Sequence, residues 1–137
     1  MVRSIDERRA AVRRLRDPED LLPLSHPVFH ILLALGDGPR HGYAIRGEVA
    51  AQTEGEAGVR SGTLYATIHR MVRDGLLEET GDRPAESDDE RRRYYRLTPF
   101  GREVAAAEAA RLAVLLRVAR SKGLVGPAVL REILRER

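Results

Sequence analysis

The amino-acid sequence predicts a mainly α-helical fold that contains one small β-hairpin. Three observations lead to this expectation. Residues 25–79 hold three short apolar-patterned segments joined by glycine-containing turns, residues 76–98 hold two strand-like runs around a polar stretch, and residues 98–123 carry one long helical pattern. Hydrophobic residues make up 42% and charged residues 33% of the 137-residue chain. That balance is typical of a folded, helix-rich, soluble protein.

The first 20 residues are strongly charged. Ser4 and Glu7 have the spacing of a helix capping box, and Pro18 would end a short helix here. Six arginines and two acidic residues give the stretch up to residue 16 a net charge of +4. We therefore expect a charged N-terminal arm or short helix, which could contact DNA phosphates, contact a partner subunit or be frayed.

Two short helices are expected next. The run SHPVFHILLALGDG offers a capping Ser25, a proline in the first turn and apolar residues on nearly every side until Gly36, so this helix should lie centrally. In HGYAIRGEVAAQT, Tyr43, Ile45, Val49 and Ala50 lie along a second helix, which His41 begins or caps and which the EGEAG segment ends.

The stretch RSGTLYATIHRMVRDGLLEE, residues 60–79, predicts a third helix with two different faces. We expect Ser61 at its N-cap, and successive side chains are then about 100° apart around the axis. The inward stripe is Leu64, Ile68, Met71, Val72 and Gly75, and the outward face is Thr63, Ala66, His69, Arg70 and Arg73, with Tyr65 on the flank. Periodicity alone does not distinguish a DNA-reading face from a solvated basic one.

A β-hairpin is expected directly after the third helix. Residues 76–80 and 92–98 suit strands, and the second run alternates, with Tyr95 and Leu97 on one face and Tyr94 and Arg96 on the other. The polar stretch GDRPAESDDER between them reads as a hairpin tip. Three short helices followed by such a hairpin are the frame of a winged helix-turn-helix with a two-stranded β wing.

A long helix follows the wing, with Thr98 at its cap and Pro99 in its first turn. It runs for about 24 residues, or roughly 36 Å, which is longer than a domain of this size can cover by itself. We expect its apolar stripe to be a dimer interface formed by Val104, Leu112, Leu115, Leu116 and Ala119. The tail GPAVLREILRER adds a further amphipathic turn or two. The expected organisation is residues 1–20 as the arm, 21–98 as the winged helix-turn-helix domain and 99–137 as the C-terminal dimerisation region.

The outward face of the third helix suits duplex DNA. Short side chains near a helix N-terminus allow close approach to the major groove, and the cations behind them can reach a guanine edge or a phosphate. The net charge of +3 permits such a partner without requiring it.

Residues 22–124 resemble the PadR family of bacterial winged-helix transcriptional regulators, most closely its shorter members with a single long C-terminal helix. Four stretches carry the resemblance in the family's order: FHILLAL; His41–Ile45; Ser61–Tyr65 continuing to Asp74–Leu77; and Arg93–Thr98 with Gly101. The resemblance implies a homodimer held by its C-terminal helices, with the third helices in successive major grooves of a partly palindromic operator and the wing on flanking DNA. It also implies repression of neighbouring genes and, in some relatives, release by a small aromatic or cationic amphiphilic effector.

By position in the family pattern, Ser61, Thr63 and Tyr65 would contact DNA at the helix start, and Tyr43 would do so from the supporting helix. The complete set of expected DNA contacts is Tyr43, Arg60, Ser61, Thr63, Tyr65, Ala66, His69, Arg70, Arg73, Arg91, Arg92 and Arg93. Two departures matter. Ala66 replaces a proline common in the family, and the wing tip is acidic, which shifts the expected wing contacts to the three arginines that follow it. The absence of tryptophan excludes the aromatic ligand pocket that some relatives build around it.

Other classes of function find little support in the sequence. The chain has no cysteine, and His26 and His30 lack partners that would complete a metal site. No catalytic motif is present, so we expect neither an enzyme nor a cofactor. No apolar run is long enough for a membrane span, and the N-terminus has no signal-peptide pattern, so we expect a cytoplasmic protein. The alternative hypothesis is a winged-helix module that only binds other proteins.

Overall fold

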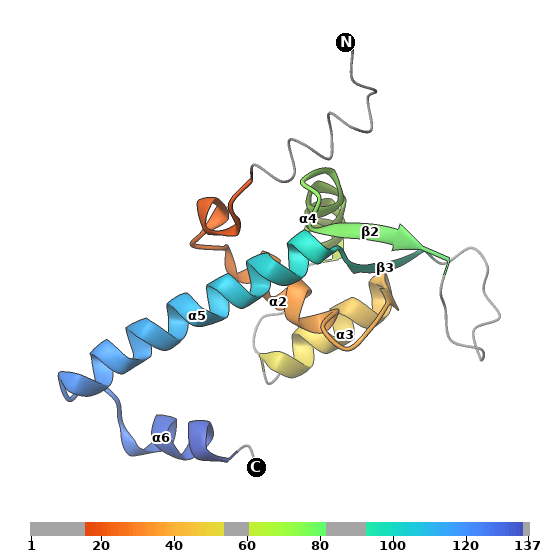
Figure 1. The fold of residues 1–137 in the computed structure, drawn as a ribbon. Helices are drawn as coiled ribbons and strands as arrows, with labels where there is room; N and C mark the ends of the chain where they lie inside the picture. The colour runs from red at the N-terminus through yellow and green to blue at the C-terminus, as the bar shows by residue number, and fades with distance from the viewer. Residues whose placement is uncertain (1–15, 54–60, 82–92, 136–137) are drawn as a thin grey trace, which may run out of the picture.

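The computed structural model describes residues 16–53, 61–81 and 93–135. In chain order its elements are a 3-10 helix η1 (Pro18–Leu21), α2 (His26–Ala34), β1 (Arg40–His41), α3 (Gly42–Gln52), α4 (Ser61–Arg73), β2 (Leu77–Thr80), β3 (Tyr94–Leu97), α5 (Pro99–Ser121) and α6 (Pro127–Leu134). The fold is the expected winged helix-turn-helix, from which α5 extends as a long rod (Figure 1). None of the helices in this part of the chain combines the length and apolar character needed to cross a membrane.

Local sequence signals explain where the helices begin. The hydroxyl of Ser25 accepts from the backbone N–H of Val28 at 3.4 Å, and His41 Nδ1 accepts from that of Ala44 at 3.2 Å. Each therefore satisfies an N–H group that has no partner within its helix. Both capping expectations are confirmed. Ser61, by contrast, is the first residue of α4 rather than the residue before it.

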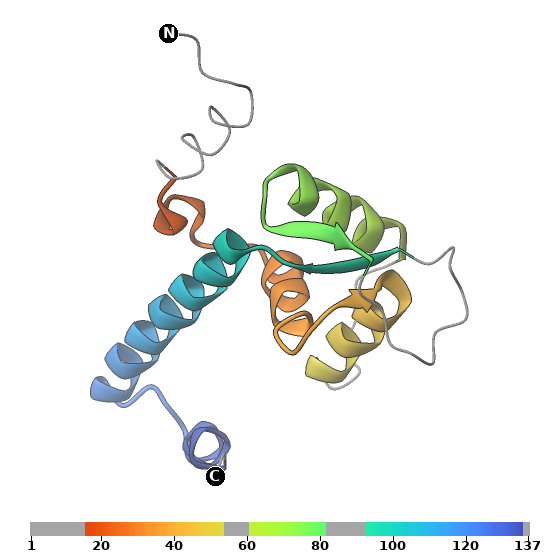
Figure 2. The same ribbon diagram turned by 45° about the vertical axis from the view of Figure 1, so that its right-hand side comes forward.

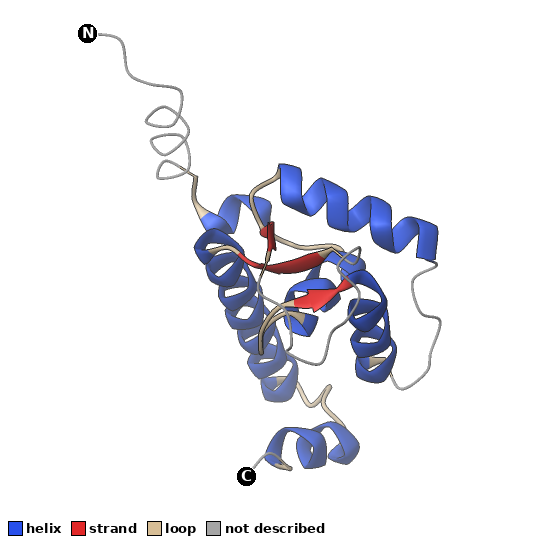
Figure 3. Cartoon of the chain, turned by 90° about the vertical axis from the view of Figure 1, so that its right-hand side faces the viewer, coloured by secondary structure: helices blue, strands red, loops and turns tan. Residues whose placement is uncertain are grey.

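One hydrophobic core joins α2, α3, α4, the sheet and the start of α5 (Figure 3). Its buried members are Ile31, Leu32, Ala34, Leu35, Ile45, Val49, Leu64, Ile68, Met71, Leu76, Leu77, Tyr95 and Val104. The helix α2 is central, as expected, although Leu33 remains 46% exposed. The inward stripe predicted for the third helix is confirmed at Leu64, Ile68 and Met71, which are at most 1% exposed.

The sheet has one strand more than the sequence indicated. Within the described residues its order is β1-β3-β2, with antiparallel neighbours, so β3 is the central strand. Arg40 pairs with Tyr95, and His41 pairs with Tyr94. Because β1 adds a neighbour to β3, Tyr94 is buried as well as Tyr95, and the expected division of β3 into an inner and an outer face is wrong at Tyr94.

A tight junction connects the end of α4, the wing and α5. Gly75 has a φ of +81°, which favours glycine, and lets the chain leave α4 for β2. The hydroxyl of Thr98 donates to the carbonyl of Gly75 at 2.5 Å, and the backbone N–H of Thr98 donates to that of Leu76 at 3.1 Å. A Cβ on Gly101 would overlap the carbonyl of Leu76. This junction fixes the direction in which α5 leaves the domain.

The first turns of α5 belong to the core of their own chain. Val104 is fully buried there, so the expectation that it lies in a dimer interface is wrong. The physical reason is that α5 packs on α2 before it extends beyond the domain. The remaining expected interface residues lie on about two later turns of the helix: Leu112 and Leu115 are exposed, and Leu116 and Ala119 are half-buried.

A buried carboxylate joins α5 to the N-terminal segment. Glu108 is 2% exposed, accepts from the backbone N–H of Leu24 at 2.6 Å and forms an ion pair with Arg111. The hydrogen bond from Arg111 lowers the pKa of Glu108, burial opposes that effect, and the Leu24 N–H lowers the pKa further. No local pattern in the sequence indicates this contact.

Several predictions concern parts of the chain that lie outside the described residues. They are the capping box of Ser4 and Glu7, Arg60, most of the wing tip, Arg91 and Arg92. The division of the chain at residues 20 and 98 also stays a prediction.

We expect the substitution Glu108→Gln to lower the free energy of unfolding at pH 7 by about 1–3 kcal/mol, because Arg111 loses its charged partner in a buried setting. The lowered pKa means that the ionised Glu108 stabilises the fold above the carboxyl's ordinary pKa of 4.5, and that this stabilisation is lost as the pH falls through the lower folded-state value. Urea unfolding at pH 7 and at successively lower pH measures the difference. The exposed Glu103→Gln on the same helix is the control, and equal effects of the two variants would contradict the assignment.

Candidate nucleic-acid interface

The outward face of α4 is accessible and free of acidic side chains. Thr63, Ala66, His69, Arg70 and Arg73 are all exposed, and the helix contains no Asp or Glu. On the reverse side the helix packs on β2, α2 and α3. Figure 2 shows α4 along one side of the sheet, with its outer face turned away from the rest of the chain. The face predicted from helical periodicity is therefore the face that the fold presents to solvent.

Small residues shape the first half of this face. Thr67 is 2% exposed, and its hydroxyl donates to the carbonyl of Thr63 at 2.8 Å, so no polar group is left unsatisfied on the inward side. Thr63 and Ala66 offer little bulk toward solvent. A surface of this kind allows another molecule to approach the backbone of α4 closely.

Tyr65 fixes the contact between α3 and α4. Its ring lies over Gly42, the first residue of α3, where any Cβ would overlap the ring atoms. Tyr65 nevertheless remains 42% exposed, and Tyr43 beside it is 71% exposed. The two phenol groups therefore stand at the surface next to the start of α4, in the positions expected for DNA contacts. Sequence reasoning did not identify the steric need for glycine at residue 42.

A surface hollow of about 490 Å³ brings several predicted residues together. Its walls are formed by His41, Gly42, Tyr43, Tyr65, His69, Arg93 and Tyr95. Four of these were expected DNA contacts, from α3, α4 and the wing. From the sequence, His41 was expected to begin or cap the second helix and Tyr95 to lie in the second strand of the wing; the HGY segment was the signal that could have placed His41 here. The hollow has hydrogen-bond donors from three elements, which suits an acceptor-rich partner.

The base of the wing is held by ion pairs. Arg93 lies 3.2 Å from Glu79, and Arg96 lies 2.8 Å from Glu78, both between β2 and β3. Exposed ion pairs of this kind contribute about 0–1 kcal/mol to the free energy of folding, so a phosphate could replace Glu79 as the partner of Arg93 at a small cost in free energy.

Tyr95 lies close to the same ion pairs. Burial raises the pKa of its phenol, and Glu79 raises it further, which keeps the phenol protonated.

The histidines of α2 have structural neighbours. The rings of His26 and His30 stack at 6.4 Å, and His30 Nδ1 lies 2.7 Å from Gln52 Oε1. Among the residues that the structure describes, no three His, Cys, Asp or Glu side chains are grouped to hold a metal ion.

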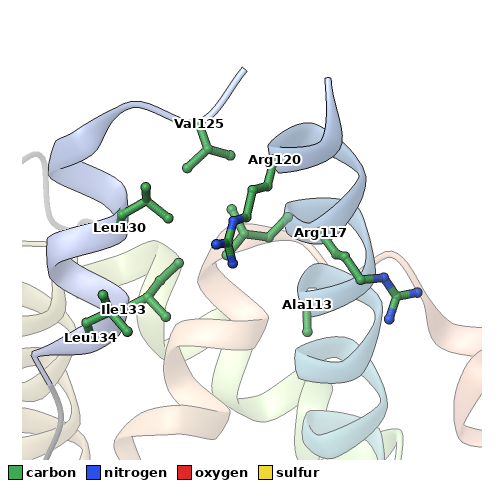
Figure 4. A pocket seen from close by; sticks show the side chains of 8 residues that line it. Ala113, Arg117, Arg120, Val125, Leu130, Ile133 and Leu134 are labelled. Atoms are coloured by element: carbon green, nitrogen blue, oxygen red, sulfur yellow. The ribbon is translucent and has the colours of Figure 1, made fainter. Parts of the chain in front are cut away.

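A second surface lies at the far end of the molecule. Leu112, Val114, Leu115 and Val118 of α5 are each more than 40% exposed, and Val129 and Ile133 of α6 are similarly accessible. Between the two helices is a hollow of about 310 Å³ with mainly aliphatic walls. In Figure 4 Leu130 and Ile133 of α6 face α5, Arg120 extends toward α6, and Arg117 points away from it.

Two curated relatives match parts of the chain. An uncharacterized 37.1 kDa protein of transposon TN4556 from Streptomyces fradiae is 38% identical over 85 residues, which are 62% of this chain and 22% of the relative. An uncharacterized protein X from Lysinibacillus sphaericus is 33% identical over 73 residues, which are 53% of this chain and 64% of the relative. The matched region thus spans less than two thirds of either relative.

Solved structures share the fold. A PadR family transcription regulator from Clostridium difficile matches with a TM-score of 0.59 and 22% identity over 71% of this chain and 97% of that one. The Bacillus subtilis PadR, solved in complex with operator DNA, matches with a TM-score of 0.51 and 16% identity over 62% of this chain and 46% of that one. These likenesses support the winged-helix architecture.

The family assignment comes from the sequence itself. Residues 31–107, more than half of the chain, match the model of the transcriptional regulator PadR-like family. The matched range begins in α2 and ends within α5, so it includes both the helix-turn-helix and the wing. The chain therefore belongs to the PadR-like family of transcriptional regulators, as its motifs predicted.

Proposed function

We propose that the chain is a sequence-specific DNA-binding repressor that acts as a homodimer on a partly palindromic operator. The observation that carries this proposal is the outward face of α4, which is accessible, free of acids and basic toward its C-terminal end. The operator complex of the Bacillus subtilis relative supports the same use of the fold.

Residues at different positions along α4 suit different kinds of DNA contact. Thr63 and Ala66 are short enough for the helix start to approach base edges, and Arg70 is long enough to reach a guanine O6 and N7. The phenols of Tyr43 and Tyr65 beside the helix start suit phosphate oxygens, which position the protein without reading sequence. Arg93 would add a contact from the base of the wing.

The dimer is supported by the exposed half of α5. The helix has 23 residues, so it is roughly 34 Å long, and its first part alone is covered by the domain. The aliphatic side chains from Leu112 to Val118 and on α6 form an apolar surface that a second copy would bury. Two-fold pairing would place two α4 helices on the same side of one duplex.

The hollow between α5 and α6 is the best candidate for an effector site. It is lined by Leu116, Val125 and Leu130, with the guanidinium of Arg120 extending toward α6 (Figure 4). A small molecule bound there would lie beside the proposed dimer surface, where it could alter the spacing of the two DNA-binding domains.

We expect the wild-type protein to bind duplex DNA from the promoter region of its own gene far more tightly than a scrambled duplex of the same length. The affinity should fall steeply as salt rises, because each neutralised phosphate releases counterions. Fluorescence anisotropy from about 50 to 200 mM salt measures both quantities. Equal affinity for the two duplexes would favour the alternative of a protein-binding module.

We expect Arg70→Ala to lower the affinity for the promoter duplex by about 1–3 kcal/mol and to weaken discrimination at one base pair, because a bidentate guanine contact would be lost. Anisotropy with a panel of single-base variants of the duplex measures this. Arg131→Ala on α6 is the matched control and should have little effect. Uniform weakening on every duplex would make Arg70 a phosphate contact instead.

We expect Leu115→Asp to convert the dimer to monomers in sedimentation velocity, because a carboxylate in the middle of an apolar interface loses its hydration. Leu33→Asp, at a similarly exposed leucine on α2, is the control and should leave the dimer intact. A dimer that survives Leu115→Asp would place the interface elsewhere.

A further inference from the structure

The hollow between α5 and α6 has walls of one chemical kind. Leu116 of α5 and Leu130 and Ile133 of α6 contribute aliphatic side chains to it. No aromatic residue follows Phe100 in the sequence, so neither α6 nor α5 beyond its second residue carries an aromatic ring. An aromatic ligand would find no ring to stack on, and an organic cation would find no π face. The walls suit a flexible aliphatic chain instead.

The charges around this hollow are positive. Residues 109–135 contain five arginines and one lysine but a single acidic residue, Glu132. Glu132 forms an ion pair with Arg135 at 3.3 Å and does not line the hollow. The charged side chains of the described chain that do line it are Arg117 and Arg120. An anionic group is therefore attracted to this site, and an organic cation is repelled.

Arg120 is the side chain best placed to bind the anion. Figure 4 shows its guanidinium extending from α5 toward α6, whereas Arg117 points away from α6. Within the described residues Arg120 has no ion-pair partner. A guanidinium can donate two parallel N–H groups to a carboxylate, which fixes the orientation of the bound group. Arg120 can therefore bind a carboxylate without giving up an existing ion pair.

The size of the hollow limits the chain that it can take. Its volume is about 310 Å³. A methylene takes up about as much space as a water molecule, roughly 30 Å³ in a liquid, so the hollow has room for about ten such groups. It can therefore hold one acyl chain of that length, but not both chains of a membrane lipid.

The ligand side of α5 differs from the proposed dimer side. Leu116 and Arg120 share one side of the helix, and both line the hollow. Leu115 and Val118 are turned from Leu116 by about 100° and about 160° at the usual helical spacing. Neither of them lines the hollow. A ligand in the hollow and a second copy on Leu115 and Val118 can therefore be bound at the same time.

We propose that the hollow binds a single-chain aliphatic carboxylate of about ten carbons, with its carboxylate on Arg120 and its chain between Leu116, Leu130 and Ile133. The role of this ligand as an effector rests on the proposed function. No residue of α6 is buried, so a chain that fills the hollow would hold α6 against α5 through contacts that the free protein lacks. This ligand class differs from the aromatic or cationic amphiphilic compounds that the family resemblance implies.

The first test is calorimetric titration of the whole chain with decanoate, hexanoate, decan-1-ol and decyltrimethylammonium. Decanoate should bind most tightly, and decan-1-ol about tenfold more weakly because it lacks the charge. Hexanoate should lose up to about fourfold in affinity for each methylene removed, because less apolar surface is buried. The cation should bind most weakly of the three ten-carbon probes. Equal affinity for decanoate and decan-1-ol, or tighter binding of the cation, would overturn the proposal.

The second test assigns the anion to one side chain. Arg120→Gln should lower the affinity for decanoate by about tenfold and leave that for decan-1-ol nearly unchanged. Arg131→Gln removes the same charge from α6 outside the hollow and should affect neither probe. Leu130→Ala should weaken the binding of both probes, because it removes part of the apolar wall. If Arg120→Gln and Arg131→Gln have equal effects on decanoate binding, the assignment of Arg120 is wrong.

The third test links the site to DNA. Decanoate, at a concentration that saturates only the wild type, should change the affinity of the wild type for the promoter duplex and leave that of Arg120→Gln unchanged. An unaltered promoter affinity of the decanoate-bound wild type would rule out the effector role. Equal affinity for promoter and scrambled duplexes would contradict the proposed function instead, whereas calorimetry requires no DNA and decides separately whether the hollow binds a carboxylate.

Discussion

The junction between α4, the wing and α5 is the constraint on which the rest of the fold depends. Thr98 satisfies the carbonyls of Gly75 and Leu76 while it caps α5 through the N–H of Gly101 at 2.9 Å. Gly101 is required because the carbonyl of Leu76 occupies the space of a Cβ. One threonine and one glycine therefore fix the end of α4, the start of the wing and the direction of α5 relative to one another.

This arrangement couples the position of the proposed DNA-binding face of α4 to the position of the exposed apolar half of α5. If α5 forms the dimer, the angle at which it leaves the domain sets the distance between the two α4 helices, and Val104 and Glu108 hold that angle by packing and by the hydrogen bond that Glu108 accepts from the Leu24 N–H. A ligand between α5 and α6 would act on the free half of α5, beyond Glu108. Any change in DNA affinity would then come from a change in dimer geometry rather than in α4 itself.

The sequence predicted the elements that repeat with a regular period. The inward stripe of α4 followed from helical spacing, and the caps at Ser25, His41 and Thr98 followed from residue type. The strand β1 was missed because two residues show no alternation and their pairing with β3 is distant in sequence. Helical periodicity grouped Val104 with Leu112 and Leu115 on one face of α5 but could not tell which neighbour covers each part of that face, so Val104 was assigned to a second chain.

Polar residues inside the fold were the hardest to predict. Glu108 occupies an inward position on α5, where a carboxylate interrupts the apolar stripe and suggests a solvent-facing turn. Its burial depends on the Leu24 N–H, 84 positions away, which no local pattern reveals. The signal that could have identified it is Arg111, three residues later on the same helix, which supplies the compensating charge.

The distribution of ion pairs also ranks the proposed DNA contacts. Arg93 is paired with Glu79, so a phosphate that binds Arg93 must displace a carboxylate and then lie close to it. Arg70 and Arg73 form no ion pair with another described residue, and no acidic side chain shares their helix. The gain on contact with a phosphate or a base is therefore larger at α4 than at the base of the wing. On this argument the proposed contacts of Arg70 and Arg73 would contribute more to the free energy of DNA binding than the proposed contact of Arg93.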